Sequence, residues 1–404
     1  MKIKKPYLLA FLVVLINSQI FRKSGANPIG LIGFQEVFYA ILFVFSLTSV
    51  YSQYSRCGKV RKLDLFVLTS VIGLSLYGAI LASITFSQPI VYGLIEERRL
   101  YAFLIYFPVY HMLRNHWISE LKLEQYIVIV AKLSVLLTFA VHIGLIPEIN
   151  SVTQNLSGFR SERYAIGHHF IGVALVIILI RSKAKIISFR EVISSGFLLS
   201  TLVVLVQSRQ IIGGVVASLI ISLKTRRAWL LTFIFFTLLI LLSFFFYDIK
   251  LYLQNYALLF ESSFSEAYLT QSWRALSIAV VLNSIGLDNI TGNGALWISW
   301  NEGFHRIHGE FFFLADIGIF GTIYRYGIVG LFVYIFYFSY QWRCLKNIKS
   351  RQSKLLYSAL FAMIIVAAPV SAPLEYRGFL SGFILAVTAY LANNTFSKKR
   401  NNCG

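Results

Sequence analysis

The sequence predicts an all-α, polytopic integral membrane protein, and three observations support this fold class. The chain of 404 residues is 57% hydrophobic and 16% aromatic, and its mean hydropathy is +0.70. Only 13% of its residues are charged, about half the share that is usual in soluble domains. Apolar stretches such as 228–247 reach the ~20 residues that a helix needs to cross a bilayer. Because their apolarity is continuous and does not alternate, helices are favoured over a β-barrel.

We expect about twelve transmembrane helices in a single membrane domain that covers residues 1–404. The first of them follows a basic start and has no small-residue cleavage site, so it is expected to remain in the protein. The expected spans lie near residues 6–21, 29–50, 65–86, 100–113, 125–146, 165–180, 191–207, 210–223, 228–247, 326–342, 355–371 and 378–392.

The net charge of +20 could indicate a nucleic-acid partner, but the distribution of the charges favours a different explanation. If both termini are cytoplasmic, the inner segments hold 24 Lys or Arg against 4 Asp or Glu, whereas the outer segments hold 12 of each. This asymmetry is the positive-inside pattern of a multi-pass membrane protein. The excess charge therefore reports orientation and contact with membrane lipids, and no nucleic-acid partner is expected.

One loop is much longer than the others. Residues 248–311 form an expected large outer (periplasmic) loop inserted between transmembrane helices, whereas most connections are short. Within it, residues 272–287 show the pattern of an amphipathic helix, and residues 286–297 are rich in Gly and Asn, as turns are. No internal repeat is visible, which weakens the alternative of a transporter built from inverted repeats.

The stretch 305–330 carries two histidines, acidic groups and two arginines at the start of an apolar run. From His308 to Arg343 a continuous helix would be about 52 Å long at 1.5 Å per residue, too long for one crossing. We therefore expect residues 305–320 to form an interfacial or re-entrant helix, on which His308 and Asp316 share a face, before the span at 326–342. The places that suit a bend are Gly318, Gly321 and Gly327.

His308 and Glu310 are the candidate catalytic residues of this stretch. A neutral imidazole titrates near pH 6.5, so His308 can accept a hydroxyl proton without special tuning. Glu310 would need a raised pKa to act as a base, or it would orient the imidazole. For His305 a solvated interfacial role is the simpler interpretation.

Several arginines are expected on the outer side. Guanidinium groups there suit a pyrophosphate, because each can hydrogen-bond to two phosphate oxygens at once and keeps its charge. Arg209 lies between two short apolar runs, and a charge so close to hydrocarbon is a functional hypothesis. The alternative is that Arg209 extends to lipid headgroups, and for Arg274 the alternative is an interface anchor beside Trp273. Whether Arg325 binds pyrophosphate or anchors its helix stays open.

Other ionisable residues carry weaker signals. Glu36 and Lys132 fall inside apolar spans, where they could pair with each other. Glu375 and Arg377 lie in an expected outer turn, where a local surface ion pair is the simpler interpretation. The adjacent His168 and His169 point to different faces of a helix, so neither a metal site nor any cofactor is expected.

The chain resembles the O-antigen ligase and polymerase superfamily of bacterial envelope glycosyltransferases at four landmarks. These are "GFRSERYAIGHH", "SRQIIGG", "WRALSIAVVLNSIGLDNITGNG" and "HGEFFFLADIGIFG", which begin at residues 158, 208, 273 and 308. Departures include Gln210 for the usual Gly, Ser284-Ile285 for Asn-Pro, and Asp316 for Glu. Gly309 follows the histidine where Asn is usual in ligases, which favours a polymerase of O-antigen or exopolysaccharide repeat units.

The resemblance implies metal-independent, inverting transfer of a glycan from an undecaprenyl-pyrophosphate-linked donor at the outer face of the bacterial inner membrane. It implies that Arg209 and Arg274 bind the donor pyrophosphate, with Arg163 and Arg325 as further candidates, and that His308 is the general base. A chain-length regulator protein is a further expected partner. The alternatives are a ligase that transfers finished glycan to an acceptor, such as a lipopolysaccharide core, and a lipid-linked oligosaccharide flippase.

Overall fold

The structure, a computed structural model, describes residues 5–18, 34–146, 166–181, 189–206, 208–222, 273–284, 290–298, 300–309 and 312–393. Every element in this part of the chain is a helix, which confirms the predicted all-α class. The chain divides into two compact units that are interleaved along the sequence. Unit 1 draws on residues 1–35, 115–264 and 350–366, and unit 2 draws on residues 36–114, 265–349 and 367–404.

Unit 1 is a group of packed helices in which α6 lies along α7, and α7 also packs against α8 and α9. Its helices are α1 (Lys5–Asn17), α6 (Glu120–His142), α7 (His168–Arg181), α8 (Phe189–Ser200) with a π-helical turn η3 (Thr201–Val206), α9 (Arg209–Ser222) and α16 (Arg351–Ala367). Small residues allow close approach, as membrane helices require. A Cβ on Gly214 would lie only 2.6 Å from Met363 Cγ, and Ser218 bonds the carbonyl of Ala359 at 2.7 Å.

An ion-pair cluster joins three helices of unit 1. Arg181 in α7 donates to both carboxylate oxygens of Glu124 in α6, each at 2.7 Å. Tyr357 in α16 donates its hydroxyl proton to the same carboxylate at 2.9 Å. Because the pair is bidentate and the carboxylate has a further donor, this buried charge is well compensated.

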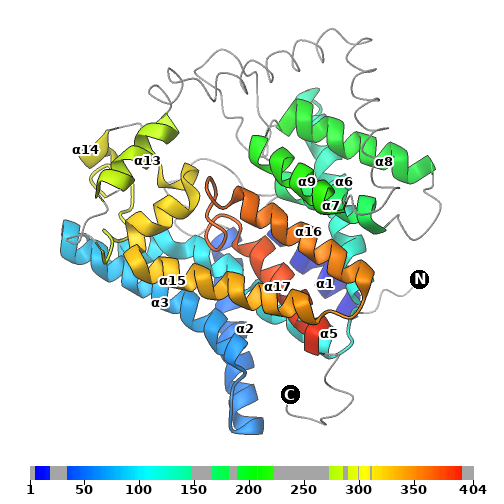
Figure 1. The fold of residues 1–404 in the computed structure, drawn as a ribbon, viewed down its shortest axis with the longest axis horizontal. Helices are drawn as coiled ribbons and strands as arrows, with labels where there is room; N and C mark the ends of the chain where they lie inside the picture. Colours follow the sequence, from blue (N-terminus) through cyan, green and yellow to red (C-terminus); the bar gives the residue numbers. More distant parts are fainter. Residues whose placement is uncertain are drawn as a thin grey trace. The chain divides into compact units, whose positions relative to one another are not determined.

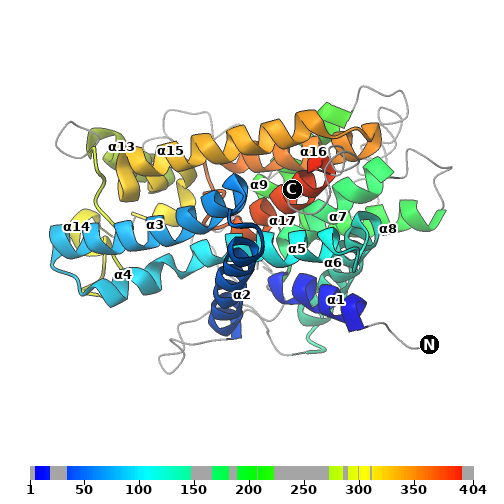
Figure 2. The same cartoon turned by 90° about the horizontal axis from the view of Figure 1, so that it is seen from below.

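Unit 2 contains the candidate site. Its helices are α2 (Phe34–Cys57), α3 (Lys62–Phe86), α4 (Ile90–Glu96), a 3₁₀ helix η1 (Glu97–Ile105), α5 (Tyr106–Arg114), α13 (Trp273–Ser284), α14 (His305–His308), η5 (Leu314–Asp316), α15 (Gly318–Asn347) and α17 (Gly378–Asn393). α15 lies beside α3 (Figure 1). Figure 2 shows α4 returning along α3. α17 packs against η1, α5 and α15.

In the part of the chain that the structure describes, four helices are long and apolar enough to cross a membrane: α2 from Glu36, α3, α6 and α15. Eleven of the twelve expected spans coincide with described helices, whereas 228–247 lies outside the described residues, as does the first part of the expected outer loop. Several of the coincident helices, such as α7 and α17, are shorter than a full crossing. Membrane association is therefore supported, and the number of twelve crossings stays a prediction.

Gly327, one of the three places predicted to suit a bend, is a break inside α15 and lies just within the expected span 326–342. Gly327 adopts φ 56° and ψ −140°, a conformation that favours glycine. Residues 290–297, here called the strap, run past the break and satisfy the backbone groups that it frees. Three backbone bonds do this: Asn293 N–H to Tyr324 O at 2.8 Å, Gly294 N–H to Arg325 O at 2.8 Å, and Ile328 N–H to Ile290 O at 3.0 Å. Such pairing is what permits a broken helix in a membrane protein.

The predicted helix over residues 305–320 is wrong. α14 ends at His308, because Gly309 turns the chain with φ 91°, and a short 3₁₀ turn at 314–316 precedes the start of α15 at Gly318. His308 and Asp316 therefore do not share a helix face. The predicted helix over 272–287 is confirmed by α13, and the predicted turn material over 286–297 is non-helical where it is described.

Candidate active site

His308 is the C-terminal residue of α14 and is partly exposed. Its Nε2 atom lies 2.6 Å from the hydroxyl oxygen of Tyr324, which is near the start of α15. The imidazole also contacts two aromatic rings, with centroids 4.5 Å from that of Phe312 and 6.5 Å from that of Phe304. One edge of the ring is thus fixed by a hydrogen bond, and its faces are fixed by aromatic neighbours.

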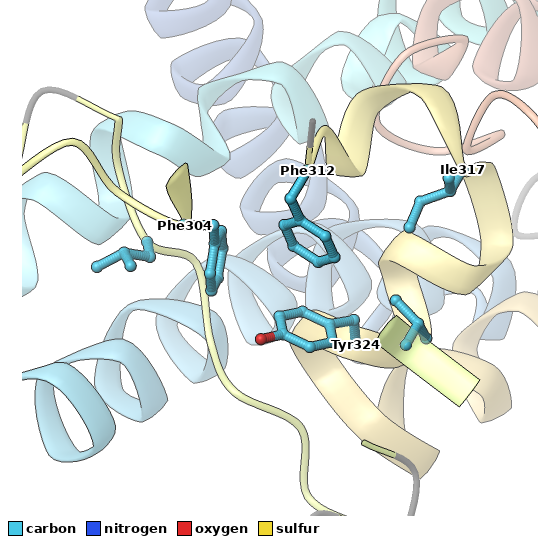
Figure 3. Packing of buried hydrophobic residues seen from close by; sticks show 6 residues of the cluster. Phe304, Phe312, Ile317 and Tyr324 are labelled. Atoms are coloured by element: carbon cyan, nitrogen blue, oxygen red, sulfur yellow. The ribbon is translucent and has the colours of Figure 1, made fainter. Parts of the chain in front are cut away.

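The neighbours of His308 belong to a buried set that we call the aromatic cluster. The rings of Phe304, Phe312 and Tyr324 surround a common centre (Figure 3), with centroid distances of 5.3, 5.3 and 5.9 Å. Aromatic pairs at this spacing contribute about 0.5–1.5 kcal/mol each beyond the burial of their area. The full cluster consists of Val281, Leu296, Phe304, Phe312, Ile317 and Tyr324. It joins α13, the strap, α14 and α15 and therefore holds His308 in one position.

Partial burial favours the neutral, proton-accepting form of His308. Desolvation lowers the pKa of His308 below its ordinary value of 6.5, so the imidazole is neutral at neutral pH. In the tautomer with its proton on Nε2, the ring donates to Tyr324 and Nδ1 presents a lone pair. Nδ1 has no hydrogen-bond partner among the residues that the structure describes. An oriented base next to a fixed partner is the arrangement found around activated hydroxyl nucleophiles.

Arg274 is attached to the same framework through α13. Its Nε atom donates to the backbone carbonyl of Asp316 at 2.9 Å. Within the described part of the chain, its two terminal nitrogens have no hydrogen-bond partner. Further along α13, Val281 is a member of the aromatic cluster and Ile278 packs against it. A partly exposed guanidinium thus keeps two donors available for an anion, in the geometry that suits phosphate oxygens.

Arg325 is occupied by carboxylates. It is only 3% exposed and forms ion pairs with Glu375 and, at 3.5 Å, with Glu97 of η1. Tyr326 donates a short hydrogen bond to Glu97, and Thr322 donates to Glu375 at 3.2 Å. Burial raises the pKa of Glu97, and the nearby guanidinium lowers it in part. The observed contacts favour the anchoring role that was left open for Arg325.

The remaining predicted site residues are not brought together in the structure. Arg209 is the first residue of α9 in unit 1, so its position relative to the His308 region of unit 2 is not defined. Arg163 and Glu310 lie outside the described residues. Their assignments as pyrophosphate-binding and catalytic residues stay predictions.

Two predicted ion pairs are wrong. Glu375 does not form a surface pair with Arg377, because both residues are buried and Glu375 pairs with Arg325. Glu36 pairs with Arg98 at 3.1 Å, whereas Lys132 is an exposed residue of α6.

Sequence reasoning missed Tyr324 and Glu97. Tyr324 is 16 positions from His308 and reaches it only because the helix is interrupted at Gly309. Glu97 is 228 positions from Arg325. The sequence indicated the Arg325–Glu97 pair only in that both charged residues lie on the expected outer side. Among the described residues, no group of three or more His, Cys, Asp or Glu side chains could hold a metal ion.

Comparison with known proteins adds no family name. No protein-family model matches the chain, and no curated protein matches it.

Proposed function

We propose that the chain is a membrane-embedded polymerase that joins undecaprenyl-pyrophosphate-linked oligosaccharide repeat units at the outer face of the bacterial inner membrane. The observation that carries the proposal is the imidazole of His308, which is held by Tyr324 and whose Nδ1 atom has no partner among the described residues. Burial, which lowers the pKa of His308, favours its neutral form. The resemblance of the motifs around residues 208, 273 and 308 supports the same function. Membrane-spanning helices and the broken helix α15 provide a setting for a lipid-linked substrate.

The proposed reaction is a single displacement at the anomeric carbon of the donor sugar. The acceptor hydroxyl attacks from the face opposite the pyrophosphate, and the new glycosidic bond forms as the bond to the pyrophosphate oxygen breaks. His308 accepts the hydroxyl proton on Nδ1, and undecaprenyl pyrophosphate leaves with the electron pair. General-base assistance of this kind contributes about 10²–10⁴-fold to a rate. Glu310, two residues after His308 in sequence, is the second proposed catalytic residue.

Negative charge grows on the leaving pyrophosphate during this displacement, and fixed cations stabilise it. Arg274 is the best supported of these cations, because two of its donors have no described partner and its Nε bond to Asp316 fixes the fork. Arg209 and Arg163 are proposed to complete the anion site. Arg325 is assigned to anchoring, since two carboxylates occupy it.

A genetic experiment tests the proposal. A strain that lacks the chain is complemented with the wild type, His308→Gln, Arg274→Met or Arg306→Met, and its lipid-linked and surface glycans are analysed. Arg306 is the matched control, because it is an exposed arginine of α14. The wild type and Arg306→Met should restore long polymer. His308→Gln and Arg274→Met should leave single repeat units, while protein levels in the membrane stay normal.

The glycans that accumulate in the strain without the chain distinguish a polymerase from a ligase and from a flippase. Single repeats transferred to the final acceptor indicate that a polymerase is missing and support the proposal. Full-length polymer retained on the lipid carrier would identify a ligase instead. Single repeats that remain on the cytoplasmic side would identify a flippase. Either of the last two results overturns the proposal.

A further inference from the structure

Three aromatic side chains form a stack at the C-terminal end of the strap, to which Trp297 belongs. Tyr92 of α4 lies nearly parallel to Trp297 and Trp300, with centroid distances of 5.0 and 5.4 Å and interplanar angles of 27° and 30°. All three side chains are partly exposed. Within the described residues, neither the two indole N–H groups nor the Tyr92 hydroxyl has a hydrogen-bond partner. Buried or half-buried Trp and Tyr usually find such partners, so this stack presents both flat apolar faces and unused polar edges.

The part of the strap that carries Trp297 is fixed by hydrogen bonds. The buried amide of Gln88 donates to the carbonyl of Ala295 at 3.0 Å and accepts from the N–H of Trp297 at 2.8 Å. The strap is tied to α3 next to this point, because Ala295 N–H donates to Gly78 O at 2.9 Å. A site with fixed side chains binds a ligand without a further entropic cost of ordering them.

Two polar residues follow the stack directly in sequence, in a strained turn. Asn301 and Glu302 directly follow Trp300, and both adopt left-handed backbone conformations, with φ of 46° and 62°. Both side chains are exposed. Non-glycine residues in this region cost about 1–3 kcal/mol each and are common at ligand-binding sites. The turn therefore brings an exposed amide and an exposed carboxylate within two residues of Trp300, and both groups can bond to hydroxyl groups.

The stack is continuous with the candidate base. Trp300 packs against the aromatic cluster. Phe304, a member of that cluster, follows four residues later and stacks against His308. Phe86, at the end of α3, packs edge-on against Phe304 at 5.7 Å. A ligand on the stack would therefore lie next to the group that is proposed to accept a proton from the acceptor.

We propose that Tyr92, Trp297 and Trp300 form a saccharide-binding platform that holds a pyranose ring of the acceptor oligosaccharide next to His308. This inference rests on the proposed function. A pyranose has an apolar C–H face that packs on an aromatic plane and a rim of hydroxyls that hydrogen-bond to polar edges. The stack offers these planes, and Asn301 and Glu302 offer the polar partners. The competing interpretation is a membrane-interface anchor, a common role of Trp and Tyr.

Direct binding tests the platform. The full-length protein in lipid nanodiscs is titrated with soluble oligosaccharides of one to three repeat units released from the host's own surface glycan, and affinity is measured by tryptophan fluorescence and calorimetry. Tyr92→Ala and Trp297→Leu should each weaken binding at least 10-fold. Trp297→Phe, which keeps an aromatic plane, should stay within about 3-fold of the wild type, where 10-fold is about 1.4 kcal/mol. Trp117→Leu is the matched control, because Trp117 is exposed in unit 1.

The controls separate the platform from folding and from catalysis. Melting temperatures of the variants should match that of the wild type, and Trp297→Phe identifies any loss that arises from packing. His308→Gln should bind oligosaccharide normally. A wild-type protein that polymerises but does not bind oligosaccharide would overturn the platform and leave the proposed function standing. A wild-type protein that binds oligosaccharide but does not polymerise would overturn the proposed function and leave the platform standing. Quenching of Trp297 fluorescence by brominated lipids, without any response to oligosaccharide, would identify a membrane anchor and overturn the platform.

Discussion

Replacement of Arg325 by Met should destabilise the protein strongly, because it leaves two buried carboxylates without their cation. Arg325 is 3% exposed and pairs with Glu97 and Glu375, which are 1% and 4% exposed. Removal of one partner of a buried ion pair costs about 3–5 kcal/mol, mainly because the remaining charge is buried and unpaired. We expect a loss in this range for Arg325→Met. The double variant Arg325→Met/Glu375→Gln should recover part of it, since one of the two orphaned charges is removed.

The loss should also depend on pH. Burial raises the pKa of Glu97, and Arg325 lowers it in part, so the carboxyl of the variant takes up a proton more readily than that of the wild type. A raised folded-state pKa means that stability is greatest at low pH and falls as pH rises through that pKa. The destabilisation by Arg325→Met should therefore be smaller at pH 5.5 than at pH 8.

The free energy of unfolding can be measured by titration with a denaturing detergent in mixed micelles. Arg274→Met is the matched control: its guanidinium is partly exposed and makes a single hydrogen bond, to a backbone carbonyl. It should change stability by less than about 1 kcal/mol and should lose transferase activity. If Arg325→Met instead kept full stability and lost only donor binding, the anchoring role would be refuted.

Three further predictions follow from the geometry of unit 2. Gly327→Ala should lower the free energy of unfolding by about 1–3 kcal/mol, because its Cβ would collide with the Ile290 carbonyl at a positive φ; Gly73→Ala, with open space around it, should be nearly neutral in the same titration. Tyr324→Phe should reduce kcat at least several-fold and leave KM unchanged, since it removes only the hydroxyl that orients the base. The acid limb of the pH–rate profile should have an apparent pKa below 6.5, because burial lowers the pKa of His308, and this limb should vanish in His308→Gln; a limb above 6.5 would contradict this.

The helices of the protein could be predicted because membrane-spanning segments are long and continuously apolar. The bend in the 305–343 stretch could also be predicted, since its length exceeds a bilayer and Gly327 offers a place to break. The helix predicted over 305–320 failed at Gly309, whose positive φ no local pattern required. Apolar residues at helical spacing there pack into a cluster around irregular backbone.

The candidate site was less accessible from sequence than the fold. His308 and Arg274 could be chosen because each is a polar residue in an apolar context, and such residues are costly unless they serve a purpose. The partners of His308 and Arg325 could not be chosen. Tyr324 of α15 reaches His308 across the non-helical segment after α14, and Glu97 reaches Arg325 across a separation of 228 residues. Such contacts depend on packing between helices, which residue spacing along one helix does not encode.

The most direct test of the account is reconstituted polymerisation by two histidine variants of α14. The purified protein in nanodiscs is supplied with undecaprenyl-pyrophosphate-linked repeat units, and both polymer and released undecaprenyl pyrophosphate are measured. His305, three residues before His308, contacts Phe313 and provides the matched control. His308→Gln should lose about 10²–10⁴-fold in rate, whereas His305→Gln should stay near the wild-type rate. A His308→Gln protein that polymerises as fast as the wild type would contradict the central claim.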